Sequence, residues 1–188
     1  ATGGVLDAPL RWTFRTPPPQ IVISHPAGGP TVRQPLILVS FDQQINAADV
    51  IEMLSLSAGG RTYAVRQATP AEVQADETVR GLAGRAGEGR WAAFFPAEPL
   101  PAATTVTVNI GAGTPSAEGP LTTTAVQSFS FQTYGPLAVS EVRCDWGDEC
   151  PPLTPWFIRF SNPLDQDAFD PSWIRVSPDL PDLSVTAS

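Results

Sequence analysis

The stretch Phe129-Ser-Phe-Gln-Thr133 alternates aromatic and polar side chains, and Trp12-Thr-Phe-Arg-Thr16 has the same pattern 117 positions earlier. Alternation with a period of two is typical of a β-strand that buries one face. Each stretch leads within a few residues into a proline. The two stretches therefore indicate two successive copies of one β-rich segment.

Other parts of the chain repeat at nearly the same spacing. Pro35-Leu-Ile-Leu-Val-Ser-Phe41 corresponds to Pro155-Trp-Phe-Ile-Arg-Phe160, and Phe160 stands 119 positions after Phe41. Leu54-Ser-Leu-Ser57 corresponds to Ile174-Arg-Val-Ser177, 120 positions later. A period of about 120 residues is too long for a solenoid unit and suits a whole β-sandwich domain.

The repeat predicts three parts. Residues 1–16 would be the closing strand of a preceding module, residues 17–134 a complete module, and residues 135–188 the first part of a following module. The alternative is a single domain over the whole chain, in which the likenesses arise only because β-strands resemble one another.

Composition and pattern together predict an all-β fold. Proline contributes 21 of the 188 residues, and each proline disfavours helix and interior strand. We expect seven strands in the complete module, at residues 21–24, 35–41, 54–57, 61–65, 91–95, 105–110 and 129–133. One core is expected to contain Trp91, Phe94 or Phe95, Val106, Val108, Phe129 and Phe131.

Two short helical elements are also predicted. Asn46 suits the cap of a single helical turn. Thr69-Pro70-Ala-Glu72 combines a capping Thr, a proline at the first helical position and a Glu at the third, which predicts a short inserted helix near 70–80. Only Val73 and Val79 are large and apolar there, so we expect a surface insertion that ends in a glycine-rich linker over residues 81–89.

The module from Pro35 to Thr133 resembles a bacterial immunoglobulin-like (Ig-like) domain of the kind found in surface-layer proteins. The resemblance lies in Pro35 to Phe41, in Phe95-Pro-Ala-Glu-Pro-Leu100, in Thr104 to Ile110, and in Phe129 to Thr133. It implies an antiparallel β-sandwich, in tandem copies. Two departures are Val106, where a Tyr is usual, and the long insertion at 70–89.

The junction Tyr134-Gly-Pro-Leu137 is similar to modules near the N-terminus of bacterial α2-macroglobulin-like proteins, which are large envelope proteins that trap proteases. The resemblance implies a non-catalytic spacer module outside the cytoplasm, anchored to a membrane through its parent protein. Its partners would be neighbouring modules and, through the parent, proteases. The macroglobulin thioester motif Cys-x-x-Gln is missing here. The alternative function is an adhesive or carbohydrate-binding surface module.

Charge and residue types argue against several other functions. The net charge is −8 and all 11 basic residues are arginines, which disfavours nucleic-acid binding. His25 is the only imidazole and no nucleophile motif accompanies it, so we expect no enzyme activity, no catalytic residues and no cofactor.

Two cysteines flank an acidic loop. In an exported protein, Cys144 and Cys150 around the turn-forming Gly147 favour a disulfide over a zinc site, which usually needs four ligands. The surface contacts that this loop offers are Trp146, Asp145, Asp148 and Glu149. Its carboxylates suit either a calcium site or a solvated turn, and the calcium-loop spacing is missing. The other tryptophans, among them Trp12, Trp91, Trp156 and Trp173, fall in strand patterns that favour the core.

The two partial modules at the ends are complementary. Residues 135–188 provide the opening strands of a sandwich and residues 1–16 provide a closing strand. We therefore predict head-to-tail self-association, in which the closing strand of one molecule completes the partial module of another. The alternative is that both ends lie against the central module of their own chain.

Overall fold

The computed structural model describes residues 8–13, 16–144, 154–177 and 183–187. The chain divides into two compact units, residues 1–101 with 105–133, and residues 102–104 with 134–188. None of the helices in the described ranges has the length and apolar character that a membrane span requires.

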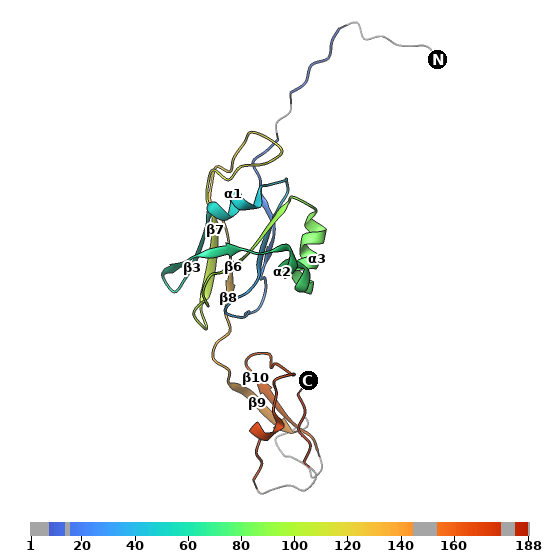
Figure 1. The fold of residues 1–188 in the computed structure, drawn as a ribbon, viewed down its shortest axis with the longest axis vertical. Helices are drawn as coiled ribbons and strands as arrows, with labels where there is room; N and C mark the ends of the chain where they lie inside the picture. Colours follow the sequence, from blue (N-terminus) through green and yellow to red (C-terminus); the bar gives the residue numbers. More distant parts are fainter. Residues whose placement is uncertain (1–7, 14–15, 145–153, 178–182, 188) are drawn as a thin grey trace, which may run out of the picture. The chain divides into compact units, whose positions relative to one another are not determined.

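The first unit is a sandwich of two four-stranded antiparallel sheets (Figure 1). The first sheet has the order β1 (Ile21–His25), β2 (Ile37–Phe41), β6 (Trp91–Pro96), β5 (Val65–Gln67). The second has the order β4 (Arg61–Tyr63), β3 (Leu54–Ala58), β7 (Thr105–Ile110), β8 (Gln127–Gln132). The all-β sandwich predicted from the sequence is confirmed.

One predicted strand is in fact two. We expected residues 61–65 to form a single strand, but Arg61–Tyr63 pairs with β3 in the second sheet and Val65–Gln67 pairs with β6 in the first. The chain therefore crosses between the sheets at Ala64, and the module has eight strands within residues 16–133 instead of seven. The hairpin before it follows from Gly59 and Gly60, whose φ angles of 57° and 76° suit a two-residue turn.

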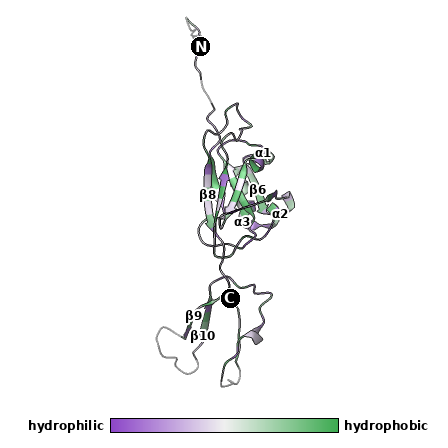
Figure 2. Ribbon diagram, turned by 90° about the vertical axis from the view of Figure 1, so that its left-hand side faces the viewer, coloured by the Kyte–Doolittle hydropathy of each residue, from purple (hydrophilic) through white to green (hydrophobic). Residues whose placement is uncertain are grey.

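The main core lies between the two sheets and contains side chains from both. Val39 and Phe94 from the first sheet and Val108 from the second are fully buried, with Phe131 beside them. Helix α1 (Ala47–Glu52) adds Val50 to this core, and the Asn46 side chain caps it by accepting a 3.1 Å hydrogen bond from the Ala48 N–H. Figure 2 shows hydrophobic residues gathered on these strands.

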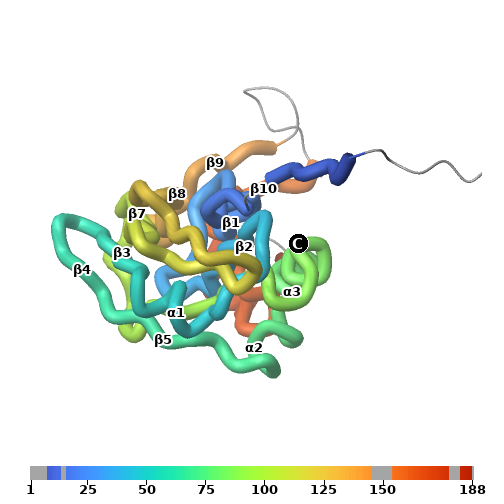
Figure 3. Tube along the Cα trace, turned by 90° about the horizontal axis from the view of Figure 1, so that it is seen from above, coloured from blue at the N-terminus to red at the C-terminus, as the bar shows by residue number. Residues whose placement is uncertain are grey.

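A second core lies on the outer face of the first sheet, where the sequence predicted only a surface insertion. Helices α2 (Pro70–Ala75) and α3 (Glu77–Ala86) pack there, on the opposite side of β2 from β3 and β7 (Figure 3). Val73 and Val79 are buried against Leu38. Two valines are enough to hold the helices against the sheet, because the outer face of the sheet also carries apolar side chains.

Two further expectations about this region are wrong. The glycine-rich stretch 81–89 is not a linker, since α3 continues through Gly81 and Gly84 to Ala86. Trp91 does not share the core of Phe94, because it packs with Phe95 against the second core. Neighbouring residues of a strand point to opposite faces of the sheet, and here both faces are covered.

The second unit contains β9 (Val139–Cys144) and β10 (Trp156–Phe160), an antiparallel pair, and the 3₁₀ turn η1 (Pro171–Trp173). The repeat pairs Ile174 to Ser177 with the strand at Leu54 to Ser57, but none of the residues from 174 to 177 lies in a strand. The assignment of residues 135–188 to the start of a following module stays a prediction at this point.

Three of the tryptophans expected in the core are exposed. Trp12 lies in residues 8–13, which have no regular secondary structure, and its side chain is 74% exposed. Trp156 and Trp173 in the second unit are 58% and 67% exposed. An alternating sequence pattern predicts that one face of a strand is apolar. That face is buried only where another layer of the protein covers it. That residues 1–16 close a preceding module stays a prediction.

The second core predicts that helix α3 is part of the stability of the module. Val79→Ala removes two buried carbons at about 0.8 kcal/mol each and leaves a cavity, so it should destabilise the fold by about 1.5 kcal/mol or more. Thr78→Ala, on the exposed side of the same helix turn, is the matched control and should change little. Urea unfolding followed by circular dichroism measures both. Equal midpoints for the two variants would mean that the helices are a dispensable insertion.

Candidate functional site

The acidic loop that the sequence singled out lies outside the described residues. This applies to Asp145, Trp146, Asp148, Glu149 and Cys150. Cys144 is described: it ends β9, is buried, and lies opposite Trp156 in the strand pair. The disulfide between Cys144 and Cys150 and the surface contacts of the loop therefore stay predictions.

The single histidine lies at the end of a strand. His25 ends β1 and is half-buried. Burial lowers its pKa below the usual value, and the negative charge of Asp76 acts in the opposite direction. Within the described part of the chain, no three His, Cys, Asp or Glu side chains gather as metal ligands would.

The strongest electrostatic arrangement among the described residues stabilises the start of α2. Glu72 accepts hydrogen bonds from both guanidinium nitrogens of Arg66, at 3.0 and 2.7 Å, and from the Thr69 N–H at 2.8 Å. The Thr69 hydroxyl in turn accepts from the Glu72 N–H, which completes the predicted capping box. These bonds, those from Arg66 first, lower the pKa of Glu72 to about 2.

Arg66 also connects this cap to the sheet. Its guanidinium lies over the Phe95 ring, 4.5 Å from the ring centroid. One side chain on β5 thus contacts both the helix start and an aromatic ring of the second core. Every contact in this group serves the fold, and the carboxylate is occupied by its structural partners.

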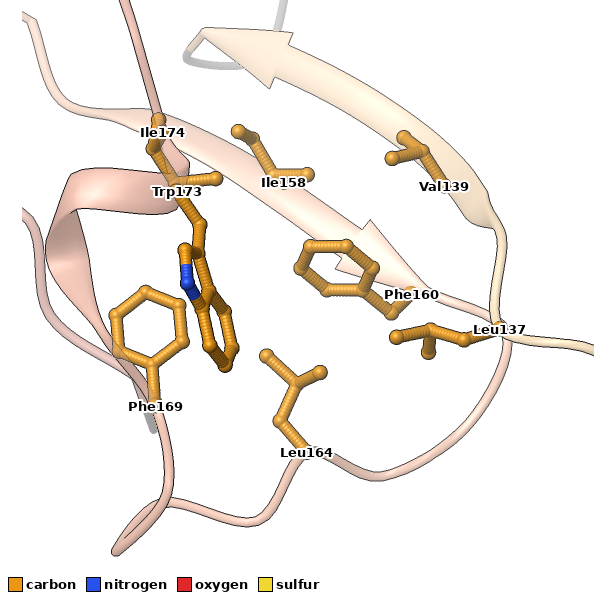
Figure 4. A pocket seen from close by; sticks show the side chains of 8 residues that line it. All are labelled: Leu137, Val139, Ile158, Phe160, Leu164, Phe169, Trp173 and Ile174. Atoms are coloured by element: carbon orange, nitrogen blue, oxygen red, sulfur yellow. The ribbon is translucent and has the colours of Figure 1, made fainter.

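An apolar pocket lies in the second unit, and sequence reasoning missed it (Figure 4). It encloses about 290 Å³ and its lining contains no charged side chain. The lining residues come from β9, β10, η1 and the segments beside them: Leu137, Val139, Ile158, Phe160, Leu164, Phe169, Trp173 and Ile174.

The pocket side chains converge from separate parts of the second unit. Figure 4 shows Phe169 beside Trp173, and their rings meet edge to face with centroids 6.0 Å apart. Ile158 and Phe160 point into the same space from β10. The signal that could have found this pocket was the repeat itself, because Ile158, Phe160 and Leu164 correspond to core residues of the first unit at an offset of 119.

The bacterial Ig-like domain family matches residues 15–133. The chain belongs to this family. The Ig-like match covers all the strands of the first unit, from β1 to β8, and ends at residue 133, directly before the C-terminal segment of the second unit. Domains of this family are typically non-catalytic, which agrees with the structural roles of the polar groups described above.

Comparison with individual proteins adds little to the Ig-like assignment. No curated protein sequence matches the chain. Among solved structures, the crystal structure of the N-terminal part of the bacterial S-layer protein SbsC is similar over 69% of this chain, with a TM-score of 0.41 and 13% sequence identity. The similar region spans 26% of that S-layer chain.

The Glu72 site predicts a pH dependence of the stability of the Ig-like module. A folded pKa of about 2 lies below the usual 4.5, so the stabilisation is present above about pH 4.5 and is lost as the pH falls toward 2. Wild type should therefore exceed Glu72→Gln in urea midpoint at pH 7, and the gap should narrow at pH 3. In Arg66→Gln, NMR titration should show a raised Glu72 pKa. A pH-independent gap would contradict this account.

Proposed function

We propose that this chain is a non-catalytic spacer module that holds other parts of a bacterial cell-envelope protein at a fixed separation. The observation that carries the proposal is the position of the two chain ends of the Ig-like module. A domain that the chain enters at one end and leaves at the other lengthens its parent protein by its own long dimension.

Hydrogen bonds place the start of the module beside the start of β8. The Ile21 N–H donates to the Gln127 side chain at 2.8 Å, and Gln127 donates in turn to the Pro19 carbonyl at 2.9 Å. The chain leaves at Thr133, after the last residue of β8. The six residues of β8 span about 17 Å. The chain therefore enters and leaves the sandwich at opposite ends.

The interior supports a mechanical role over a binding role. Both cores are closed by side chains, and among the described residues no buried side-chain polar atom lacks a hydrogen-bond partner. Buried Gln43, for example, donates to the Pro17 carbonyl and accepts from the Ser116 hydroxyl at 2.7 Å. Satisfied polar groups leave nothing in the module interior to recognise a ligand.

For the parent protein, the proposal is an α2-macroglobulin-like protease trap outside the cytoplasm, attached to a membrane through other parts of that protein. The resemblance of Tyr134-Gly-Pro-Leu137 to macroglobulin junctions supports this context. Neighbouring modules of the same parent would be the direct partners, and proteases would be bound elsewhere in the parent.

A glycan array, run with and without calcium, separates the spacer from an adhesive module. The spacer proposal expects no saturable binding in either condition. Saturable binding that calcium enhances and Trp146→Ala abolishes would contradict it and assign an adhesive role to the loop between the cysteines.

The macroglobulin context has a separate test on the full-length parent protein. A thioester between Cys and Gln reacts with methylamine, which forms an amide and releases one cysteine thiol. We expect one new thiol per chain, measured by alkylation and mass spectrometry. Release of none would reject the macroglobulin parent and leave the spacer role of this module standing.

A further inference from the structure

The strand pair of the second unit repeats the first strand pair of the Ig-like module residue by residue. Ile21 pairs with Phe41, and Val139 pairs with Phe160, at offsets of 118 and 119. Both pairs have a register irregularity at the same place, directly after these residues. Ile23 then pairs with Ser40, as Glu141 pairs with Arg159 at the same offsets.

Hydrogen bonds outside the strands repeat as well. The Asp42 N–H donates to the Gln20 carbonyl at 3.1 Å, and the Ser161 N–H donates to the Ala138 carbonyl at 2.8 Å. In return, the Gln20 N–H donates to the Asp42 carboxylate at 2.8 Å, and the Ala138 N–H donates to the Ser161 hydroxyl at 3.0 Å. The two units thus form the same hydrogen bonds at equivalent positions, although the residue types at those positions differ.

The turn that follows the strand pair is also shared. In the first unit Asn46 accepts from the N–H two residues on, at 3.1 Å, and Asp165, 119 positions later, accepts from the Asp167 N–H at 3.1 Å. The Gln43 amide donates to the Pro17 carbonyl, and the Asn162 amide donates to the Gly135 carbonyl at 2.8 Å. The strand pair, bulge, closing hydrogen bonds and cap of residues 135–169 therefore repeat those with which the first sandwich opens.

The pocket of the second unit occupies the position of the main core in the first. Its residues correspond to core residues at an offset of 119: Ile158 to Val39, Phe160 to Phe41, and Leu164 to Ile45. Phe169 corresponds in the same way to Val50, the residue that α1 contributes to the core. Val39 is 0% exposed, whereas Ile158 is 36% exposed, because no second sheet of the described residues lies over it.

Within the part of the second unit that the structure describes, no strand stands where the first unit has β6. Strand β2 lies between β1 and β6, with Val39 opposite Ala92. Strand β10 corresponds to β2 and pairs with β9 alone among the described residues. An unpaired edge beside an apolar face is the surface that an added β-strand recognises, by main-chain hydrogen bonds along the edge and by side chains over the face.

We infer that the pocket and the free edge of β10 form a docking surface for a β-sheet equivalent to the part of the Ig-like module after α1. That partner pairs a strand of the β6 type with β10 and lays an apolar sheet of the β3 and β7 type over Ile158 and Phe160. The surface goes beyond the spacer role and is independent of the macroglobulin context.

The chemistry of the surface selects this occupant over others. The pocket lining carries no charge, which suits the valines and leucines that face Val39 in the first unit and offers nothing to an anion or a cation. The open edge requires main-chain donors and acceptors, which a sugar or a lipid does not present in strand geometry. A helix would cover the face but would leave the edge unpaired.

The test supplies the partner within one chain. The chain up to Ser177 is continued with a second copy of residues 54–133, which contains the strands from β3 to β8. We expect hydrogen exchange of the Trp156 to Phe160 amides to be slower than in the unextended chain, by a factor of about ten or more. Trp173 fluorescence should shift to shorter wavelength as the ring is covered.

Matched variants make the result specific. Val108→Asp in the appended copy alone should return exchange at β10 to the rate of the unextended chain, because it disrupts the donated sheet. Phe169 is larger than Val50, so a second version carries Phe169→Val to fit the donated core. If β10 gains no protection in either version, whether the chain is soluble or aggregated, the inference is overturned.

The unextended chain provides the second arm. The inference expects a monomer in sedimentation, whereas the head-to-tail strand exchange predicted from the sequence expects a larger assembly. A dimer that Ile158→Asp dissociates would assign the surface to a second copy of the chain, by strand exchange with residues 1–16 or by edge pairing, and would also overturn the inference.

Discussion

Strand β2 is buried on both faces. Val39 points into the space between the two sheets, while Leu38, its neighbour in the chain, points to the helices on the outer face. A strand of this kind needs a covering layer on each side, because an uncovered large apolar side chain forgoes about 1.5 to 3 kcal/mol of burial free energy. The second sheet meets this requirement on one face, and α2 with α3 meets it on the other. The inserted helices therefore bury the outer face of β2 as the second sheet buries its inner face.

The same constraint applies to the second unit, where no second sheet covers the strand pair among the described residues. Strand β10 carries Phe157 and Ile158 on opposite faces, as β2 carries Leu38 and Val39, and both are more than a third exposed. The register, bulge and closing hydrogen bonds of the strand pair are all made within residues 135–169. Contacts within this short segment thus account for the strand pair.

The polar interactions at the start of α2 fix the positions of neighbouring elements. Arg66, Glu72 and Thr69 join a strand end, a helix cap and an aromatic ring, and the low pKa of Glu72 follows from those bonds. A perturbed carboxyl in a cleft would suggest catalysis, but this one is exposed and fully engaged in a capping box. The group tunes the stability of the module near the point where the chain crosses from one sheet to the other.

The amino-acid sequence by itself determined the local elements of this protein. The alternation of Val106, Val108 and Ile110, the Asn46 and Thr69 caps and the glycine turn at 59–60 depend on neighbours within a few residues, so they could be predicted. The repeat also pointed to the first strand pair of the second unit. Tertiary structure alone decided the crossing at Ala64, the second core under α3, and the exposure of Trp12, Trp156 and Trp173. These features share one physical reason. A side chain is buried only when two surfaces meet, and the pattern of one strand specifies only one of those surfaces.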